Sequence, residues 1–295
     1  PIPVAGEILV KVYAATVNRT DCAILTAKPF LMRFFTGFFV PKLKIMGTDF
    51  AGQIVGIGNN VSGFAVGDRV FGFNGLGYSS HAEYISIPAN GPVIRIPDAI
   101  TYELAAASAE AAYYAIDMVG PKAAQKALVN GATGAIGSAT VQFLKYYGLY
   151  VTAVCHSDKT ALVQSLGADK IIPYNKVDFT KDEEQYDLVF DAVGKSSFGH
   201  CKPLLKPKGI FASTEPNILQ VLISPLLGGK KYRFRPPKDT KAALTKIKGL
   251  LETGRFCPVI DRRYALAEIV TAFEYVASGQ KIGNVILNLE LKTHP

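Results

Sequence analysis

The segment LVNGATGAIGSATVQFLKYYG contains glycines at intervals of three residues: Gly131, Gly134 and Gly137. A short apolar run at 126–130 leads into the first glycine, and a run typical of a helix, 137–147, begins at the last one. Because glycine has no side chain, it permits tight turns and a close approach of the backbone to another group. The segment therefore predicts a strand, a glycine turn and a helix, in this order.

The pattern of the sequence changes near residue 100. Before it, short strand-like runs punctuated by glycine predict a β-rich, barrel-like unit, with strands at 7–13, 52–58, 68–73, 82–87 and 93–96. After it, helices and strands alternate, which predicts a doubly wound parallel sheet covered by helices on both faces. The expected elements there are a helix over 101–119, strands at 126–130, 150–154, 170–174, 186–193, 209–214 and 283–289, and helices at 238–251 and 265–277.

A strand, a glycine turn and a helix together can form the phosphate-binding part of a dinucleotide site. Backbone N–H groups of the turn and the positive end of the helix both favour a pyrophosphate. The alternative is a tight turn that binds nothing. We expect the dinucleotide site, formed by Gly131, Ala132, Thr133, Gly134, Ala135, Ile136 and Gly137.

The tip of the second predicted strand indicates which dinucleotide is preferred. An acidic side chain at this tip binds the ribose hydroxyls of NAD. This chain has Cys155-His156-Ser157-Asp158-Lys159, in which a hydroxyl, a histidine and a lysine suit a 2′-phosphate. We therefore expect NADPH to be preferred to NADH. Asp158 keeps NADH open, unless it caps a helix that starts at Lys159.

Composition limits the class of protein further. The chain has 295 residues, of which 49% are hydrophobic, enough for two packed domains. It has no apolar run of membrane-spanning length and no signal-peptide pattern, and its four cysteines lie far apart, so we expect a cytoplasmic protein. The net charge of +8 is spread along the chain without a nucleic-acid motif, which favours anionic ligands over nucleic acid.

Segments along nearly the whole chain resemble the medium-chain dehydrogenase/reductase superfamily, most closely its zinc-free quinone oxidoreductase branch. They include GEILVKVYAATVNRTD, GTDFAGQIVGIG, LVNGATGAIG, SLGADKIIPY and YDLVFDAVG. The resemblance implies a discontinuous GroES-like catalytic domain, 1–111 and 256–295, a Rossmann cofactor domain, 112–255, and a homodimer. Relatives carry about one more strand pair before GEILVKV, so the sequence is expected to be a truncated or incompletely determined form.

The resemblance also implies a site without zinc. Zinc-dependent relatives have cysteine where this chain has Asn18 and histidine where it has Thr48, and the segment of the third ligand, 108–115, lacks cysteine. Zinc prefers thiolate and imidazole ligands. Asp49 and Glu110 could offer only hard carboxylate oxygens, which would hold zinc weakly. No metal is therefore expected.

Individual roles follow from the same resemblance. Asn18 is similar to the residue near the nicotinamide ribose and Asp21 to the residue that holds its loop, and these two are the catalytic candidates. Alternatively both are turn formers, Tyr174 belongs to the core and Asp191 caps a strand end. Besides Asn18 and the glycine turn, the cofactor candidates are His156, Ser157, Lys159, Tyr174, Asp191, Val193, Gly194 and Asn284.

The expected activity is hydride transfer from NADPH to a quinone or another activated carbonyl compound or alkene. The apolar runs 29–42 and 216–234 suit an apolar or aromatic acceptor. For the phenylalanines at 30–39, however, a core helix is the default interpretation, and a wall of the substrate cleft or a partner surface are the alternatives. Three alternatives stay open: an enoyl-thioester reductase, an NADPH-binding protein with little turnover, and a single-stranded nucleic-acid binder.

Overall fold

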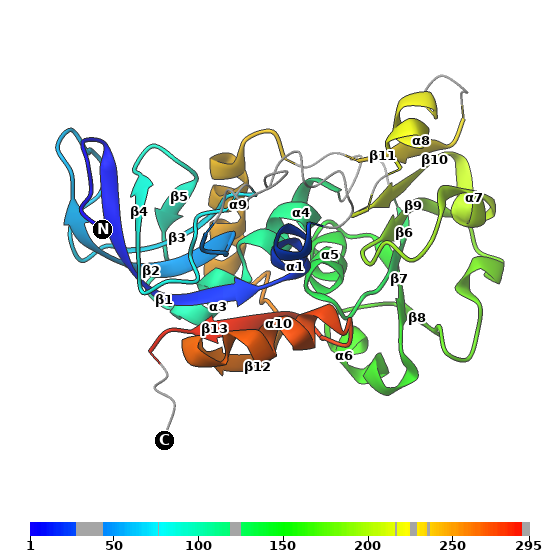
Figure 1. Cartoon of the computed structure of the whole chain (residues 1–295). Helices are drawn as coiled ribbons and strands as arrows, with labels where there is room; N and C mark the ends of the chain where they lie inside the picture. Colours follow the sequence, from blue (N-terminus) through cyan, green and yellow to red (C-terminus); the bar gives the residue numbers. More distant parts are fainter. Residues whose placement is uncertain are drawn as a thin grey trace. The chain divides into compact units, whose positions relative to one another are not determined.

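The computed structural model describes residues 1–27, 44–75, 77–118, 125–215, 217–224, 229–234 and 237–290. The phenylalanine-rich run 30–39 lies outside the described residues. The chain forms two compact units (Figure 1): unit 1 is Pro1–Glu110 with Asp239–Pro295, and unit 2 is Ala111–Lys238. The second boundary lies before helix α9 (Thr240–Glu252), whereas the sequence prediction put it after Arg255. Helix α9 belongs to unit 1 because it packs on strand β5 (Val93–Arg95).

Unit 1 is built on one sheet, which has seven strands within the described residues. The order is β12-β13-β1-β2-β3-β5, with β4 paired to β1, and only β12 and β13 are parallel neighbours. The remaining bounds are β1 (Glu7–Val17), β2 (Asp49–Ile57), β3 (Arg69–Phe73), β4 (Tyr84–Pro88), β12 (Ile260–Ala265) and β13 (Asn284–Asn288). Alternate β1 residues Ile8, Val10 and Val12 point into the core and pack with Phe50 and Ile54.

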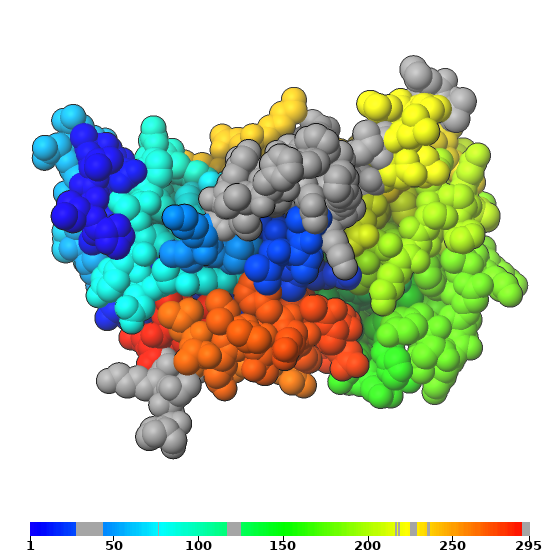
Figure 2. Space-filling model, viewed as in Figure 1, coloured from blue at the N-terminus to red at the C-terminus, as the bar shows by residue number. Residues whose placement is uncertain are grey.

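The helices of unit 1 pack on this sheet or on one another. They are α1 (Arg19–Thr26), α3 (Tyr102–Ala107), α9, the short 3-10 turn η5 (Leu266–Glu268) and α10 (Ile269–Ala277), and α4 (Glu110–Met118) begins at the last residue of the first segment. The predicted single helix 101–119 is two helices: α3 ends at Ala107, and its C-cap Ser108 donates both its N–H and its hydroxyl to the carbonyl of Leu104. Helix α10 packs on β13 through Ala272 and Val276, and its outer side forms part of the surface in Figure 2.

Unit 2 contains a parallel sheet, with six strands among the described residues, in the order β11-β10-β9-β6-β7-β8. The bounds are β6 (Lys126–Asn130), β7 (Tyr150–Cys155), β8 (Lys170–Pro173), β9 (Tyr186–Asp191), β10 (Leu205–Ser213) and β11 (Lys231–Arg233). From β6 the chain adds strands toward one edge of the sheet (β7, β8), and from β9 it adds them toward the other edge (β10, β11). This change of winding direction between β6 and β9 is the doubly wound arrangement that was predicted. Ligands of such sheets bind outside the carboxyl ends of the strands at this reversal.

Helices connect the strands of unit 2. They are α5 (Ala135–Tyr146), α6 (Thr160–Ser165), α7 (Phe198–Cys201) and α8 (Ile218–Ile223), with 3-10 turns η2 (Ser157–Lys159), η3 (Phe179–Lys181) and η4 (Lys202–Leu204). The buried core beneath them includes Leu128, Val154, Tyr186, Val189 and Phe211. In the part of the chain that the structure describes, no helix combines the length and apolar character needed to cross a membrane.

Candidate functional site

The glycine turn joins β6 to α5, and its glycines have different reasons to be glycine. Gly131 has φ +79°, and a Cβ there would lie 2.4 Å from Cγ1 of Val193. A Cβ on Gly137 would lie 2.1 Å from the carbonyl oxygen of Gly131, so this glycine lets the helix pack against the turn. Gly134 has φ −70°, and a Cβ there would meet only the Gly131 oxygen, at 3.5 Å. The fold therefore does not require glycine at position 134.

The backbone donors of the turn divide into two groups. The N–H groups of Gly131 and Ala132 both donate to the carbonyl of Val154, and that of Gly134 donates to Gly131. Gly134 is the N-cap of α5 and has no side chain that could accept a hydrogen bond from the helix. The first helical N–H groups, those of Ala135, Ile136 and Gly137, have no preceding turn of helix whose carbonyls could accept from them. These donors and the positive helix end suit a pyrophosphate. Of the seven predicted turn residues, Thr133, Ala135, Ile136 and Gly137 have N–H groups without a hydrogen-bond partner among the described residues, and the last three lie at the start of the helix.

The tip of β7 presents mixed polar groups. His156 caps η2 by accepting from the N–H of Asp158 through Nδ1, at 3.4 Å. Ser157 is held by Asn175, which accepts from its N–H at 2.9 Å and donates to its Oγ at 3.1 Å. The suggestion that Asp158 caps a helix is wrong, because α6 starts at Thr160 without a side-chain cap, and the Asp158 carboxylate, 73% exposed, accepts from the Ser157 hydroxyl.

Lys159 and Tyr174 both lie next to this tip, bonded through their backbone N–H groups to the carbonyls of His156 and Cys155. Lys159 donates its backbone N–H to His156, and its ammonium has no ion-pair or hydrogen-bond partner among the described residues. The ring of Tyr174 meets the His156 ring edge-on at 5.8 Å between centroids and is 55% exposed, so the core interpretation of this tyrosine is wrong. The tip thus offers a free ammonium, a hydroxyl and two rings.

Asp191 is the last residue of β9, next to β6 where the winding direction of the sheet changes, and it is completely buried. Its carboxylate accepts from Nδ2 of Asn130 at 3.1 Å and from the N–H groups of Val193 and Ser196 at 3.2 and 2.8 Å. Burial raises the pKa of Asp191. Its position is that of a strand-end cap, and the direct cofactor contact that we predicted has no exposed carboxylate atom to make it. Gly194, with φ +65°, completes the loop that this cap holds.

Asn284, the cofactor candidate at the start of β13, is also engaged locally. Its side-chain Nδ2 donates to the carbonyl of Val259 at 3.0 Å, and its backbone N–H donates to the same oxygen at 2.8 Å. The residue is 6% exposed. Its side-chain amide therefore anchors the segment before β12 within unit 1.

Asn18 and Asp21 form the N-terminal cap of α1. Oδ1 of Asn18 accepts from the N–H of Asp21 at 3.1 Å, and the Asp21 carboxylate accepts from the N–H of Asn18 at 3.0 Å. This reciprocal pair is a capping box, which satisfies two donors at the start of the helix. The turn-former interpretation therefore applies to both residues, and it also fixes the direction in which the Asn18 amide points.

The Asn18 amide nitrogen points to Glu110, the first residue of α4. The Glu110 carboxylate accepts from Asn18 Nδ2, from Thr20 Oγ1 at 2.6 Å and from Thr48 Oγ1 at 2.6 Å, and Asn18 also donates to Thr48 at 3.1 Å. We call Asn18, Thr20, Thr48 and Glu110 the Glu110 cluster. In zinc-dependent relatives, the positions of Asn18 and Thr48 and the segment 108–115 hold the zinc ligands. The Glu110 cluster brings these three parts of the chain together. From the sequence alone, Glu110 was predicted only as a weak metal ligand, and its contact with Asn18 was not predicted.

The surroundings of the cluster are buried and mostly acidic. Burial raises the pKa of Glu110 and, helped by repulsion from Glu110, raises the pKa of Asp21 and Asp49 well above the usual range. Asp49 accepts from Thr16 through both the N–H, at 2.7 Å, and the hydroxyl, at 2.6 Å. Burial lowers the pKa of Lys281 to about 8, against the attraction of Glu110. The charges partly compensate one another within unit 1.

Comparisons with known proteins agree on one family. The model of the alcohol dehydrogenase GroES-like domain matches residues 4–98, and that of the zinc-binding dehydrogenase matches residues 166–287. A 2-methylene-furan-3-one reductase of Solanum lycopersicum is 28% identical over 96% of this chain and 71% of its own. A chloroplastic quinone oxidoreductase of Triphysaria versicolor is 29% identical over 97% of this chain and 91% of its own. The chain belongs to the medium-chain dehydrogenase/reductase superfamily.

Its fold agrees with that membership. The solved structure of the quinone oxidoreductase from Coxiella burnetii matches this medium-chain reductase with a TM-score of 0.84, over 98% of this chain and 93% of the other, at 23% identity. The relatives place the protein in the quinone-oxidoreductase-like branch, as a nicotinamide-dependent oxidoreductase. The predicted family, fold class and enzyme class are thereby confirmed.

The donor groups of this site differ from those that zinc prefers. Among the described residues, no group of three or more His, Cys, Asp or Glu side chains is placed to hold a metal ion. The Glu110 cluster offers an amide, two hydroxyls and one carboxylate, all hydrogen-bonded to one another. Amide and hydroxyl groups are poor zinc ligands. The residues present do not fit a zinc ion.

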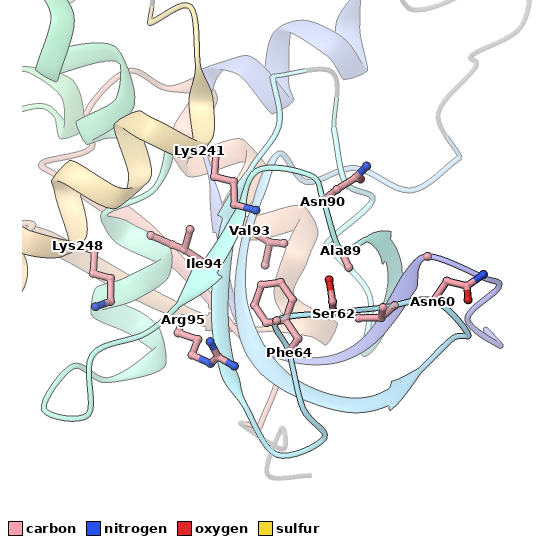
Figure 3. A pocket seen from close by; sticks show the side chains of 13 residues that line it. Asn60, Ser62, Phe64, Ala89, Asn90, Val93, Ile94, Arg95, Lys241 and Lys248 are labelled. Carbon is pink, nitrogen blue, oxygen red and sulfur yellow. The ribbon is translucent and has the colours of Figure 1, made fainter.

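A separate cavity of about 630 Å³ lies in unit 1 of the reductase (Figure 3). Arg95 and Phe64 line it together with Lys241 and Lys248 of α9. Arg95 lies over the Phe64 ring and pairs with Asp68 at 2.8 Å, and Lys248 pairs with Glu252. None of the predicted site residues lines this cavity, and two of its three cations are already neutralised.

Proposed function

We propose that this medium-chain reductase transfers a hydride from NADPH to a quinone or another activated carbonyl compound or alkene, without zinc. The observation that carries the proposal is the Glu110 cluster, where hydrogen bonds among Asn18, Thr48 and Glu110 occupy the places of metal ligands in zinc-dependent relatives. A zinc ion could enter only if these bonds broke, and it would find no thiolate or imidazole in return. The match to the zinc-binding dehydrogenase model, 166–287, does not include these residues.

The tip of β7 supports NADPH. The free ammonium of Lys159 and the hydroxyl of Ser157 are groups that bind phosphate, and a charge-assisted hydrogen bond to phosphate is stronger than a neutral one. The exposed carboxylate of Asp158 argues in the opposite direction, because it would repel a 2′-phosphate and could accept from ribose hydroxyls. The ring of Tyr174 offers a surface for the adenine or for the phosphate edge.

The chain's own groups then bind and orient the reactants, and the bound nicotinamide supplies the hydride. The free N–H groups of Ala135, Ile136 and Gly137 hold the pyrophosphate. Asn18 uses its amide hydrogens within the cluster, so only the second lone pair of Oδ1 is left to accept from a ribose hydroxyl. Without a Lewis acid to polarise a carbonyl group, quinones and conjugated enones should react faster than simple ketones.

The test is stopped-flow oxidation of NADPH and NADH with quinones, conjugated enones, enoyl thioesters, simple ketones and aldehydes. Each assay is repeated after dialysis against a strong chelator, with zinc counted by elemental analysis. We expect NADPH to be oxidised fastest with a quinone or enone, at a rate that chelation leaves unchanged. Stoichiometric zinc whose removal abolishes turnover would contradict the proposal. Tight NADPH binding without oxidation by any acceptor would support the low-turnover alternative.

A further inference from the structure

The capping box of α1 fixes the orientation of the Asn18 side-chain amide through its oxygen. Its Oδ1 accepts from the N–H of Asp21 at 3.1 Å, as part of the capping box of α1. Reversing the amide would set its nitrogen against that N–H, donor against donor. The nitrogen therefore has to face the interior of unit 1, where it needs acceptors.

Glu110 is the acceptor that this geometry requires. Its side chain comes from α4, 92 residues away in sequence, and the residue is only 5% exposed. In the described structure its oxygens accept from Asn18, Thr20 and Thr48, which belong to two separate segments of unit 1. A buried carboxylate is costly unless donors surround it. Three uncharged donors surround this one, and each must point its hydrogen toward Glu110.

We propose that Glu110 is a positioning residue for hydride transfer, which holds the Asn18 amide so that the free lone pair of Oδ1 is presented to the nicotinamide ribose. The inference rests on the proposed function, because the contact between Asn18 and the ribose is part of that proposal. Glu110 acts through Asn18 and does not itself touch the reactants. The carboxylate thereby organises this part of the site, as a metal ion does in zinc-dependent relatives.

The substitution Glu110→Gln tests this role. It keeps the size of the side chain but replaces one of the two acceptor oxygens by a donor, so position 110 can no longer accept from Thr20 through one oxygen and from Asn18 and Thr48 through the other. Since a small displacement of a positioning group can cost up to about a hundredfold in rate, we expect hydride transfer to slow by roughly ten- to a hundredfold. The Kd of adenosine 2′,5′-bisphosphate, which probes only the adenosine end of the site, should change by less than about twofold, because binding at the β7 tip does not involve Asn18.

A second substitution should restore what the first one removes. In the double variant Asn18→Asp/Glu110→Gln, the new amide can donate to the new carboxylate, which still accepts from the N–H of Asp21. The donor and acceptor are exchanged and the total charge is kept. We expect the double variant to regain at least about tenfold of the lost rate, whereas Asn18→Asp alone, with two facing carboxylates, should stay slow. Such non-additivity is the sign of a direct contact.

Glu103→Gln is the matched control. Glu103 is a half-buried glutamate of unit 1 that accepts from Arg263 at 2.8 Å and Asn288 at 3.0 Å, outside the Glu110 cluster. It should lower the melting temperature slightly and leave the rate of hydride transfer unchanged. Unchanged hydride transfer in Glu110→Gln, or a loss in rate that the folded double variant does not recover, would overturn the proposal.

Two further measurements keep the test decisive. If Glu110→Gln does not fold, Thr48→Val removes one donor to Glu110 at similar volume. Hydride transfer should then slow by roughly threefold or more, while adenosine 2′,5′-bisphosphate still binds; an unchanged rate would refute the proposal.

Coupling between positions 18 and 110 is also measured by NADPH titration, which needs no turnover. If the wild-type protein reduces no acceptor, the proposed function fails, and coupling in NADPH affinity still supports or refutes the role of Glu110.

Discussion

The substitution Gly134→Val should separate cofactor binding from folding. A side chain at this position projects away from the protein, because its Cβ would meet only the Gly131 oxygen, at the ordinary distance of 3.5 Å. The backbone conformation, φ −70° and ψ 169°, is one that any residue adopts. The branched side chain would occupy the space above the free N–H groups that follow, where we place the pyrophosphate.

The expected magnitudes follow from this geometry. Losing one or two charge-assisted hydrogen bonds costs about 1.5–3 kcal/mol, so the Kd of NADPH should rise by roughly ten- to a hundredfold. The fold should lose about 1 kcal/mol or less, the usual cost of a poorer helix N-cap. Gly137→Ala should behave in the opposite way, because its Cβ would lie 2.1 Å from a backbone oxygen, and such overpacking costs about 1–3 kcal/mol of stability.

Isothermal titration calorimetry with NADPH and thermal unfolding of the free protein measure the two effects. Gly199→Val is the matched control in unit 2, since a Cβ there would meet only Oγ of Ser197, at 3.8 Å. It should leave the affinity for NADPH unchanged. If Gly134→Val binds NADPH as tightly as the wild type does, the glycine turn is not the pyrophosphate site and our reasoning about the free helix donors is refuted.

Two further predictions concern cofactor choice and pH. NADPH should bind more tightly than NADH. In calorimetry, Lys159→Ala should bind NADPH roughly ten- to a hundredfold more weakly and NADH with little change, and Asp158→Asn should bind NADPH more tightly. Equal affinities of the wild-type protein for the two cofactors would refute the role of Lys159. Burial lowers the pKa of His81, whose Nε2 lies 2.9 Å from the carbonyl of Thr16, so the folded state binds a proton less readily than the unfolded state does. The free energy of unfolding should therefore fall as the pH drops below about 6.5, by up to about 1.4 kcal/mol per pH unit. Urea unfolding from pH 5 to 8 measures this loss, which His81→Gln should lack. If the free energy of unfolding depends on pH in the same way in both proteins, the role of His81 is contradicted.

Much of unit 2 could be predicted because its strands are buried on both faces. Such strands are nearly continuous apolar runs, and β6 begins and ends at the predicted residues, Lys126 and Asn130. Two of the strands at sheet edges, β11 and β12, were not predicted. β11 is three residues long, with Tyr232 buried between two cationic side chains, and β12 carries the exposed Arg262 and Arg263. Their strand structure depends on pairing with β10 and β13, which no local pattern indicates.

The candidate site divides in the same way. The glycine turn could be predicted because its residues are consecutive and their spacing reflects one local geometry. The contact of Glu110 with Asn18 could not, because Glu110 stands in an alanine-rich helix whose local sequence has no sign of a partner 92 residues away. Asp191 shows a related limit. The family resemblance made it a cofactor candidate, whereas the three donors around its buried carboxylate are a feature that the sequence does not indicate.

The central claim is direct hydride transfer from NADPH without a metal. The most direct measurement uses NADPH that carries deuterium at both C4 positions of the nicotinamide, a conjugated enone as the acceptor, and protein whose zinc content is counted after chelation. We predict one deuterium on carbon in each product molecule, with far less than one zinc per chain and an unchanged rate. A product without deuterium, or transfer that returns only when zinc is added back, would contradict the account.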